Sequence, residues 1–184
     1  VGYETTESTS TVLTVLPVVS GSTEGGNTVE IFLDLTAFYA ESGGQVGDQG
    51  TIRCATGEIK VSDTVFALPG LRKHIGTLAG DISAGTNVTA TINSALRNAT
   101  RKNHTATHIL HYALREVLGE HVKQAGSMVS ADRLRFDFSH YAAVSPEELR
   151  EIERLANLQV LKNCGVAVYE TSKDEATKAG AIAF

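Results

Sequence analysis

Two histidines four residues apart are the side chains in this sequence best placed to do chemistry together. His104 and His108 lie in the run Arg101-Lys-Asn-His-Thr-Ala-Thr-His-Ile-Leu-His111, which predicts a helix. Residues i and i+4 share one face of a helix, so both imidazoles could bind one metal ion. Thr105 stands where H-E-x-x-H proteases carry their general base, so that motif is absent. The two nitrogens make half of a tetrahedral zinc site, and such a pair is also common as a chance feature of a helix surface.

The same predicted helix carries a basic group formed by Arg97, Arg101 and Lys102. Lys and Arg side chains that neutralise phosphates supply most of the sequence-independent affinity for nucleic acids. The group could therefore meet phosphates, although three charges on one helix also suit a solvated face. His111 continues the histidine stripe at i+7, where we expect hydrogen bonding or packing.

A glycine-rich segment, Gly43-Gly-Gln-Val-Gly-Asp-Gln-Gly50, has the composition of a phosphate-binding loop. It matches neither the P-loop nor the G-x-G-x-x-G pattern, so a hairpin turn is the alternative interpretation. Cys54 and Cys164 are too few for a disulfide framework. We interpret both as free thiols of a protein in the reducing cytoplasm.

Short strands must position the glycine-rich segment in the first half of the chain. Apolar runs at Thr11–Val19, Thr28–Leu35, Thr51–Arg53 and Asn87–Ile92 are separated by turn signals such as Gly43-Gly44, Pro69-Gly70 and Ala84-Gly85. This pattern predicts a small β-barrel or a sandwich over residues 1–93.

Helical periodicity begins near Ser94 and positions the histidines. A helix is expected from about Ser94 to Leu118, with a possible break near Asn103 and a stop at Gly119. Arg133–Phe138 alternates as a half-buried strand, and Val166–Glu170 also predicts a strand. Capping boxes at Ser145 and Ser172 open a helix to about Asn163 and a short helix that ends at Gly180. Residues 94–184 are therefore expected to be helices packed on a sheet, and the fold class is α+β.

The composition is that of an ordinary globular protein, with 42% hydrophobic and 20% charged residues among 184. No apolar run approaches the roughly 20 residues of a membrane helix, and no secretory signal opens the chain. The first residue is Val1 rather than Met, which suggests a piece of a longer protein.

Four segments of the chain, in this order, resemble the editing region of the alanyl-tRNA synthetases. They are Phe38–Gly50, Asn103–His108, Val122–Ser127 and Leu134–Ser139. The glycine-rich block is specific to that family, and with the ends of the chain the resemblance covers essentially the whole sequence. It implies a glycine-rich β-barrel followed by an α/β editing subdomain.

The resemblance also implies a reaction, which is hydrolysis of the ester that joins serine or glycine wrongly to the alanine tRNA. A synthetic site that must accept alanine cannot strongly exclude glycine or serine, so a second, hydrolytic sieve is needed. The implied partner is alanine tRNA, with neither DNA nor a membrane. The implied cofactor is Zn²⁺, and ATP would be used by an upstream ligase domain of a cytoplasmic protein.

Carried over position by position, the resemblance makes His104 and His108 zinc ligands. Thr107 would recognise the serine side chain, and Gln124 and Ser127 would line the same pocket. The implied tRNA contacts are Gly43, Gly44 and Gln45 of the loop and Arg97, Arg101 and Lys102 of the helix.

The family completes its zinc site with a Cys-x-x-x-His, and neither cysteine fits that pattern. Glu58 follows Cys54 at the fourth position, and Val168 follows Cys164. We therefore expect this stretch alone to bind zinc weakly or not at all, and to hydrolyse mischarged tRNA poorly. A free-standing trans-editing hydrolase and a non-catalytic tRNA-binding module are the alternatives. The editing domain of threonyl-tRNA synthetase has a similar His motif but lacks the Phe38–Gly50 block.

Overall fold

The computed structural model describes residues 5–18, 27–167 and 171–180 of the 184-residue chain. It divides into two compact units. The first comprises Val1–His104 with Met128–Arg133, and the second comprises Thr105–Ser127 with Leu134–Phe184. We call them the barrel unit and the helical unit. No helix in the described part of the chain is both long and apolar enough to span a bilayer.

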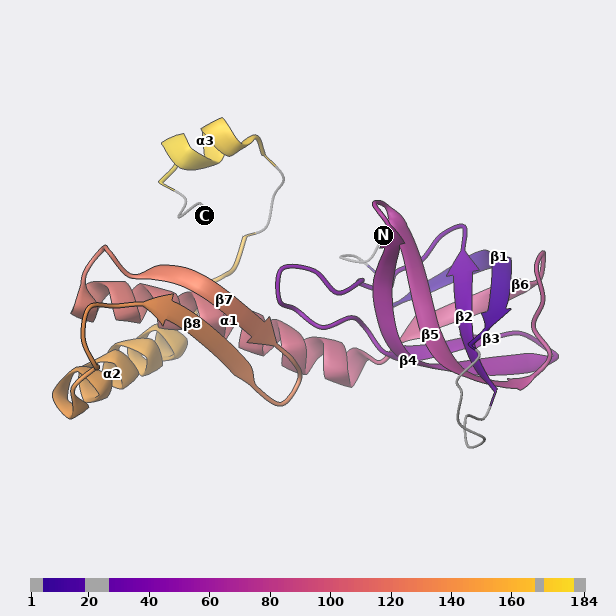
Figure 1. Cartoon of the computed structure of the whole chain (residues 1–184), viewed down its shortest axis with the longest axis horizontal. Coiled ribbons are helices and arrows are strands. Elements are labelled where there is room, and N and C mark those ends of the chain that lie inside the picture. The colour runs from indigo at the N-terminus through magenta and orange to yellow at the C-terminus, as the bar shows by residue number, and fades with distance from the viewer. Residues whose placement is uncertain (1–4, 19–26, 168–170, 181–184) are drawn as a thin grey trace. The chain divides into compact units, whose positions relative to one another are not determined.

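The barrel unit is built on six antiparallel strands that close on themselves (Figure 1). The strands are β1 (Glu7–Pro17), β2 (Thr28–Leu33), β3 (Gly50–Arg53), β4 (Gly57–Leu68), β5 (Leu71–Gly80) and β6 (Asn87–Ile92). Their order around the barrel is β1-β2-β5-β4-β3-β6, and β6 pairs with β1 to complete the circle. Closure leaves no free sheet edge, which would otherwise expose unpaired backbone groups.

Side chains that alternate between the inside and the outside of the strands fill the barrel. In β6, Val88, Ala90 and Ile92 are buried between more exposed residues, and β2 alternates in the same way. One cluster of buried apolar residues results; it includes Val12, Ile31, Phe38, Ile52 and Ile59. Here the sheet curls around its apolar face and closes, and this buries the inward-facing side chains of all six strands against one another.

Helix α1 (Ser94–Leu118) follows the barrel and runs through the boundary between the two units. Asn93 caps it, because its Oδ1 accepts a hydrogen bond from Leu96 N at 3.2 Å. Gly119 ends it with a φ of 109°, a conformation that L side chains rarely adopt.

The helical unit adds a two-stranded sheet of β7 (Lys123–Val129) and β8 (Leu134–Ser139), then α2 (Pro146–Lys162) and α3 (Lys173–Lys178). The last two residues of β7 belong to the barrel unit. The core of the helical unit joins Ala113 and Leu114 of α1 with Val122 and Ile152, and Phe136 and Phe138 of β8 pack against them. In Figure 1 the hairpin β7–β8 and helix α2 lie beside the C-terminal part of α1.

Most predicted elements are confirmed, including the small barrel, the helix from Ser94 to Leu118 and both capping boxes. The predicted break near Asn103 is wrong. Helix α1 continues unbroken through Asn103. The side chain of Asn103 does not cap a new helix; its Nδ2 donates to the Ser130 carbonyl at 2.9 Å. In the predicted strand Val166–Glu170, residues 166 and 167 are not in a strand, and the rest lie outside the described residues. Strands β4, β5 and β7 were not predicted as strands.

Candidate functional site

Helix α1 carries both candidate metal ligands on its surface. His104 and His108 are exposed and stand one helical turn apart, so their side chains project from one face of α1. His111, one turn further, is buried instead. Its ring lies 5.1 Å from that of Phe136, and its Nε2 lies 3.5 Å from the Val122 carbonyl, which agrees with the packing role expected for it.

The glycine-rich segment supplies a direct neighbour of His104. The Nδ1 atom of His104 lies 2.6 Å from Oε1 of Gln45, and Gln45 is only 8% exposed. Sequence reasoning assigned Gln45 to the tRNA and missed this contact. The two positions are 59 residues apart in the chain, and no sequence pattern connects them.

The segment forms the hairpin turn that was the alternative interpretation. Ser42 and Gln45 exchange backbone hydrogen bonds of 3.2 and 3.0 Å across Gly43 and Gly44. Both glycines have positive φ, 58° and 83°, as a tight two-residue hairpin turn requires. The amide groups of Ser42, Gln45, Val46 and Asp48 all donate to carbonyls within the protein, so they do not form a phosphate cradle.

Asp48, near the end of the same segment, holds Arg97 of α1. The Arg97 guanidinium makes a two-pronged ion pair with the Asp48 carboxylate, and Nη2 also donates to the Ala37 carbonyl at 3.2 Å. The side chains are only 12% and 7% exposed, so the pair is largely shielded from water. Asp48 further accepts a hydrogen bond from Tyr39 N at 2.7 Å. The other two predicted tRNA contacts on α1, Arg101 and Lys102, are exposed.

The three residues predicted to recognise the substrate lie in the helical unit. Thr107 is buried on α1, between the two exposed histidines in sequence. Gln124 and Ser127 are half-buried in β7, and Gln124 Nε2 donates to Ser127 Oγ at 3.2 Å. The structure thus brings together Gln124 with Ser127 and Gln45 with His104.

The described residues contain no group of three or more His, Cys, Asp or Glu side chains that could hold a metal ion. Cys54 lies in the barrel unit, where its thiol hydrogen-bonds Thr56 Oγ1 at 3.2 Å, and this contact lowers the pKa of the thiol. Cys164 is exposed just after the end of α2. Two imidazoles are therefore the metal-binding groups that this region of α1 offers.

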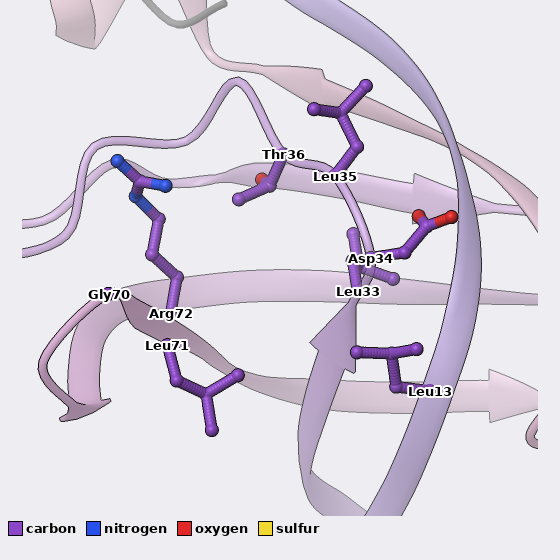
Figure 2. A pocket seen from close by; sticks show the side chains of 8 residues that line it. All are labelled: Leu13, Leu33, Asp34, Leu35, Thr36, Gly70, Leu71 and Arg72. Atoms are coloured by element: carbon purple, nitrogen blue, oxygen red, sulfur yellow. The ribbon is translucent and has the colours of Figure 1, made fainter.

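A separate pocket of about 250 Å³ lies on the barrel and contains none of the predicted site residues. Figure 2 shows its leucine side chains with Asp34, Thr36 and Arg72 around them. Asp34 accepts from Thr11 N at 2.8 Å, Thr36 hydrogen-bonds His74, and the Arg72 guanidinium lies over the Phe66 ring, 5.7 Å from its centroid. The pocket therefore offers no cluster of reactive groups.

Comparison with known proteins identifies the family. The family model described as tRNA synthetases class II (A) matches residues 1–96, just over half of the chain. The chain therefore belongs to the class II (A) tRNA synthetases.

The similarity to alanine–tRNA ligases extends over the entire chain. The identity is 48% to the alanine–tRNA ligase of Pelotomaculum thermopropionicum, 48% to that of Pseudoalteromonas translucida and 47% to that of Chloroflexus aurantiacus. All of the chain is covered in each case, but only 21% of the relative. The chain thus corresponds to about a fifth of the length of the curated relatives that it matches.

Proposed function

We propose that this chain is part of the editing region of an alanine–tRNA ligase, and that this region, once its zinc site is complete, hydrolyses the ester of alanine tRNA mischarged with serine or glycine. The observation that carries the proposal is the histidine pair on α1, with Gln45 of the glycine-rich turn against His104. It occurs in a chain that matches alanine–tRNA ligases from end to end. We assign the barrel to residues 1–93 and the catalytic part to residues 94–184.

The donor groups suit zinc. Imidazole nitrogen is a common zinc ligand, and two imidazoles one helical turn apart can share one ion. We propose that His104 and His108 hold it with two ligands of a Cys-x-x-x-His elsewhere in the longer protein. Bound zinc would polarise the ester carbonyl or activate water for the attack.

The remaining residues bind and select the substrate in this proposal. Thr107 offers a hydroxyl to the serine side chain, and a hydroxyl that hydrogen-bonds its substrate discriminates better than an apolar wall. Gln124 and Ser127 line the proposed pocket for the serine side chain, and the hydrogen bond between them restrains both side chains.

The tRNA contacts divide into two kinds. Arg101 and Lys102 are exposed on α1 and can neutralise phosphates directly. Arg97 is already committed to Asp48, so we propose that it acts by holding the turn of Gly43, Gly44 and Gln45 in place beside the tRNA end. ATP would be used by the ligase reaction in another part of the protein.

The test compares this 184-residue chain with a longer chain that continues for about 60 residues of the natural sequence beyond Phe184. Zinc content and the deacylation of serine-charged alanine tRNA are measured for both. We expect the longer chain to bind one zinc and to hydrolyse the ester, and the shorter chain to do both poorly. In the longer chain, replacing His104 and His108 together by Ala should abolish zinc binding, whereas His140→Asn should leave it unchanged.

The same experiment distinguishes the alternatives. Binding of tRNA without zinc or hydrolysis in either chain would replace the proposal with a tRNA-binding module. Stoichiometric zinc at micromolar metal in the 184-residue chain would instead contradict the split zinc site.

A further inference from the structure

The contact between Gln45 and His104 bears on which ring nitrogen of the histidine is available to bind a metal. We infer that Gln45 is a positioning residue that keeps the proton of His104 on Nδ1 and so presents Nε2 as the ligand atom. The inference rests on the proposed function for the identity of the metal. The tautomer itself can be tested without any metal.

The 2.6 Å contact itself assigns the proton. An amide oxygen can only accept hydrogen bonds, so with Gln45 Oε1 facing it, Nδ1 of His104 must be the donor. In a neutral imidazole one nitrogen carries the proton and the other carries the lone pair. The lone pair of His104 is therefore on Nε2.

Gln45 is held firmly enough to impose this choice. Its backbone closes the turn at Gly43 and Gly44, and the neighbouring residues are tied to Val129. Val46 N donates to the Val129 carbonyl at 3.0 Å, and Val129 N donates to the Gly44 carbonyl at 2.8 Å. All these residues belong to the barrel unit, as does His104. These bonds fix the backbone at Gln45, and the residue is only 8% exposed, so ordering its side chain costs little additional conformational entropy when the metal arrives.

The expected consequence for metal binding is large. A histidine ligand almost always donates its second N–H to an oxygen, which fixes the tautomer and the orientation of the ring. Loss of such a partner typically lowers metal affinity by about 10- to 100-fold. Gln45 is thus expected to contribute to zinc affinity without touching the zinc.

The first experiment reads the tautomer of His104 by ¹H–¹⁵N NMR of the metal-free 184-residue chain at about pH 8, where imidazoles are neutral. We expect the Nδ1–H form in the parent chain. Gln45→Glu keeps an acceptor oxygen and should keep this form, whereas Gln45→Leu should release it. Gln49→Leu, at an exposed glutamine of the same segment, is the matched control and should change nothing. Unchanged amide spectra of the barrel strands show that each variant folds.

The second experiment measures zinc affinity of the same variants in the extended chain. Gln45→Leu should weaken it by about 10- to 100-fold, with rescue in Gln45→Glu. An Nε2–H form in the parent chain would overturn the inference, and so would a Gln45→Leu variant with unchanged tautomer or zinc affinity. If the extended parent chain bound no zinc, the proposed function and the metal part of this inference would fall together, while the NMR result would still decide the role of Gln45 in the tautomer.

Discussion

At the scale of single residues, buried polar groups in the barrel unit are matched by specific partners. Arg97 and Asp48 neutralise each other, and the Tyr39 amide donates a further hydrogen bond to the Asp48 carboxylate. His74 is fully buried beside Phe38; its Nδ1 donates to the Ile31 carbonyl at 3.1 Å, and its Nε2 accepts from the Thr36 hydroxyl at 2.9 Å. Removing one partner from such an arrangement leaves the other buried and unsatisfied, which costs more than the contact itself contributes.

His74 makes the stability of the barrel depend on pH. Burial, assisted by the charge of Arg72, lowers the pKa of His74 from 6.5 to about 4. The unfolded chain therefore binds more protons than the folded one between these values. The contribution to stability is fully present above pH 6.5 and is lost as the pH falls towards 4. Between pH 7 and pH 5 the loss from this group is about 2 kcal/mol.

We expect His74→Gln to reduce this pH dependence. Urea unfolding followed by circular dichroism at pH 7 and pH 5 would give the fall in the free energy of unfolding for each protein. The fall should be about 2 kcal/mol smaller in His74→Gln than in the parent chain. His108→Gln removes an exposed histidine and should retain the parent dependence. Equal falls in the parent and in His74→Gln would show that His74 is not the responsible group.

At the scale of elements, the glycine-rich segment must fold tightly to place Gln45. Gly43 and Gly44 supply the two positive φ angles of the turn, whereas Gly47 is required for a different reason. A Cβ atom at Gly47 would overlap the Thr64 carbonyl oxygen and lie 2.7 Å from Asp63 Oδ1. Gly47 therefore lets the segment approach β4 closely.

Alanine substitutions should separate these two requirements. Gly47→Ala forces backbone against backbone and should lower the free energy of unfolding by about 3 kcal/mol or more. Gly43→Ala has open space around the new Cβ, so only the left-handed strain of about 1 kcal/mol is expected. Urea unfolding of both variants gives the comparison. A smaller loss for Gly47→Ala than for Gly43→Ala would mean that the segment can move away from β4.

At the scale of the whole molecule, each unit has its own apolar core. Ile52 is completely buried in the barrel core, and Ile152 of α2 is buried in the core of the helical unit. The two clusters have no described residue in common. We therefore expect them to respond separately to the loss of buried apolar volume.

Hydrogen exchange of backbone amides would show this separation. Ile52→Ala should destabilise by about 2 to 5 kcal/mol and accelerate exchange in β1–β6. Ile152→Ala should accelerate exchange in α2 and the last turns of α1 instead. Leu161→Ala, at a side chain 80% exposed on α2, is the control and should have little effect. Accelerated exchange throughout the chain in both variants would show one cooperative molecule.

Sequence patterns were sufficient where the signal is local. The strand Asn87–Ile92, the helix Ser94–Leu118 and the Ser145 capping box are each specified by neighbours in the chain. The sequence pattern did not predict strands β4 and β5, because polar and charged residues interrupt their apolar runs. It did predict the turn at Pro69-Gly70 that joins them. Their pairing with each other and with β2 and β3 makes them strands.

The sequence by itself determined that His104 and His108 share a helix face, that Gly43 and Gly44 form a turn and that the chain resembles alanyl-tRNA synthetases. These properties depend on spacing of a few residues and on residue type. Only the tertiary structure decided that Gln45 contacts His104 and that Arg97 is committed to Asp48, 49 residues away in the chain. The antiparallel pairing of β3 with β6, in which Gly50 lies opposite Ile92, brings the segment before β3 next to the start of α1. The separation of these groups along the chain carries no periodic signal.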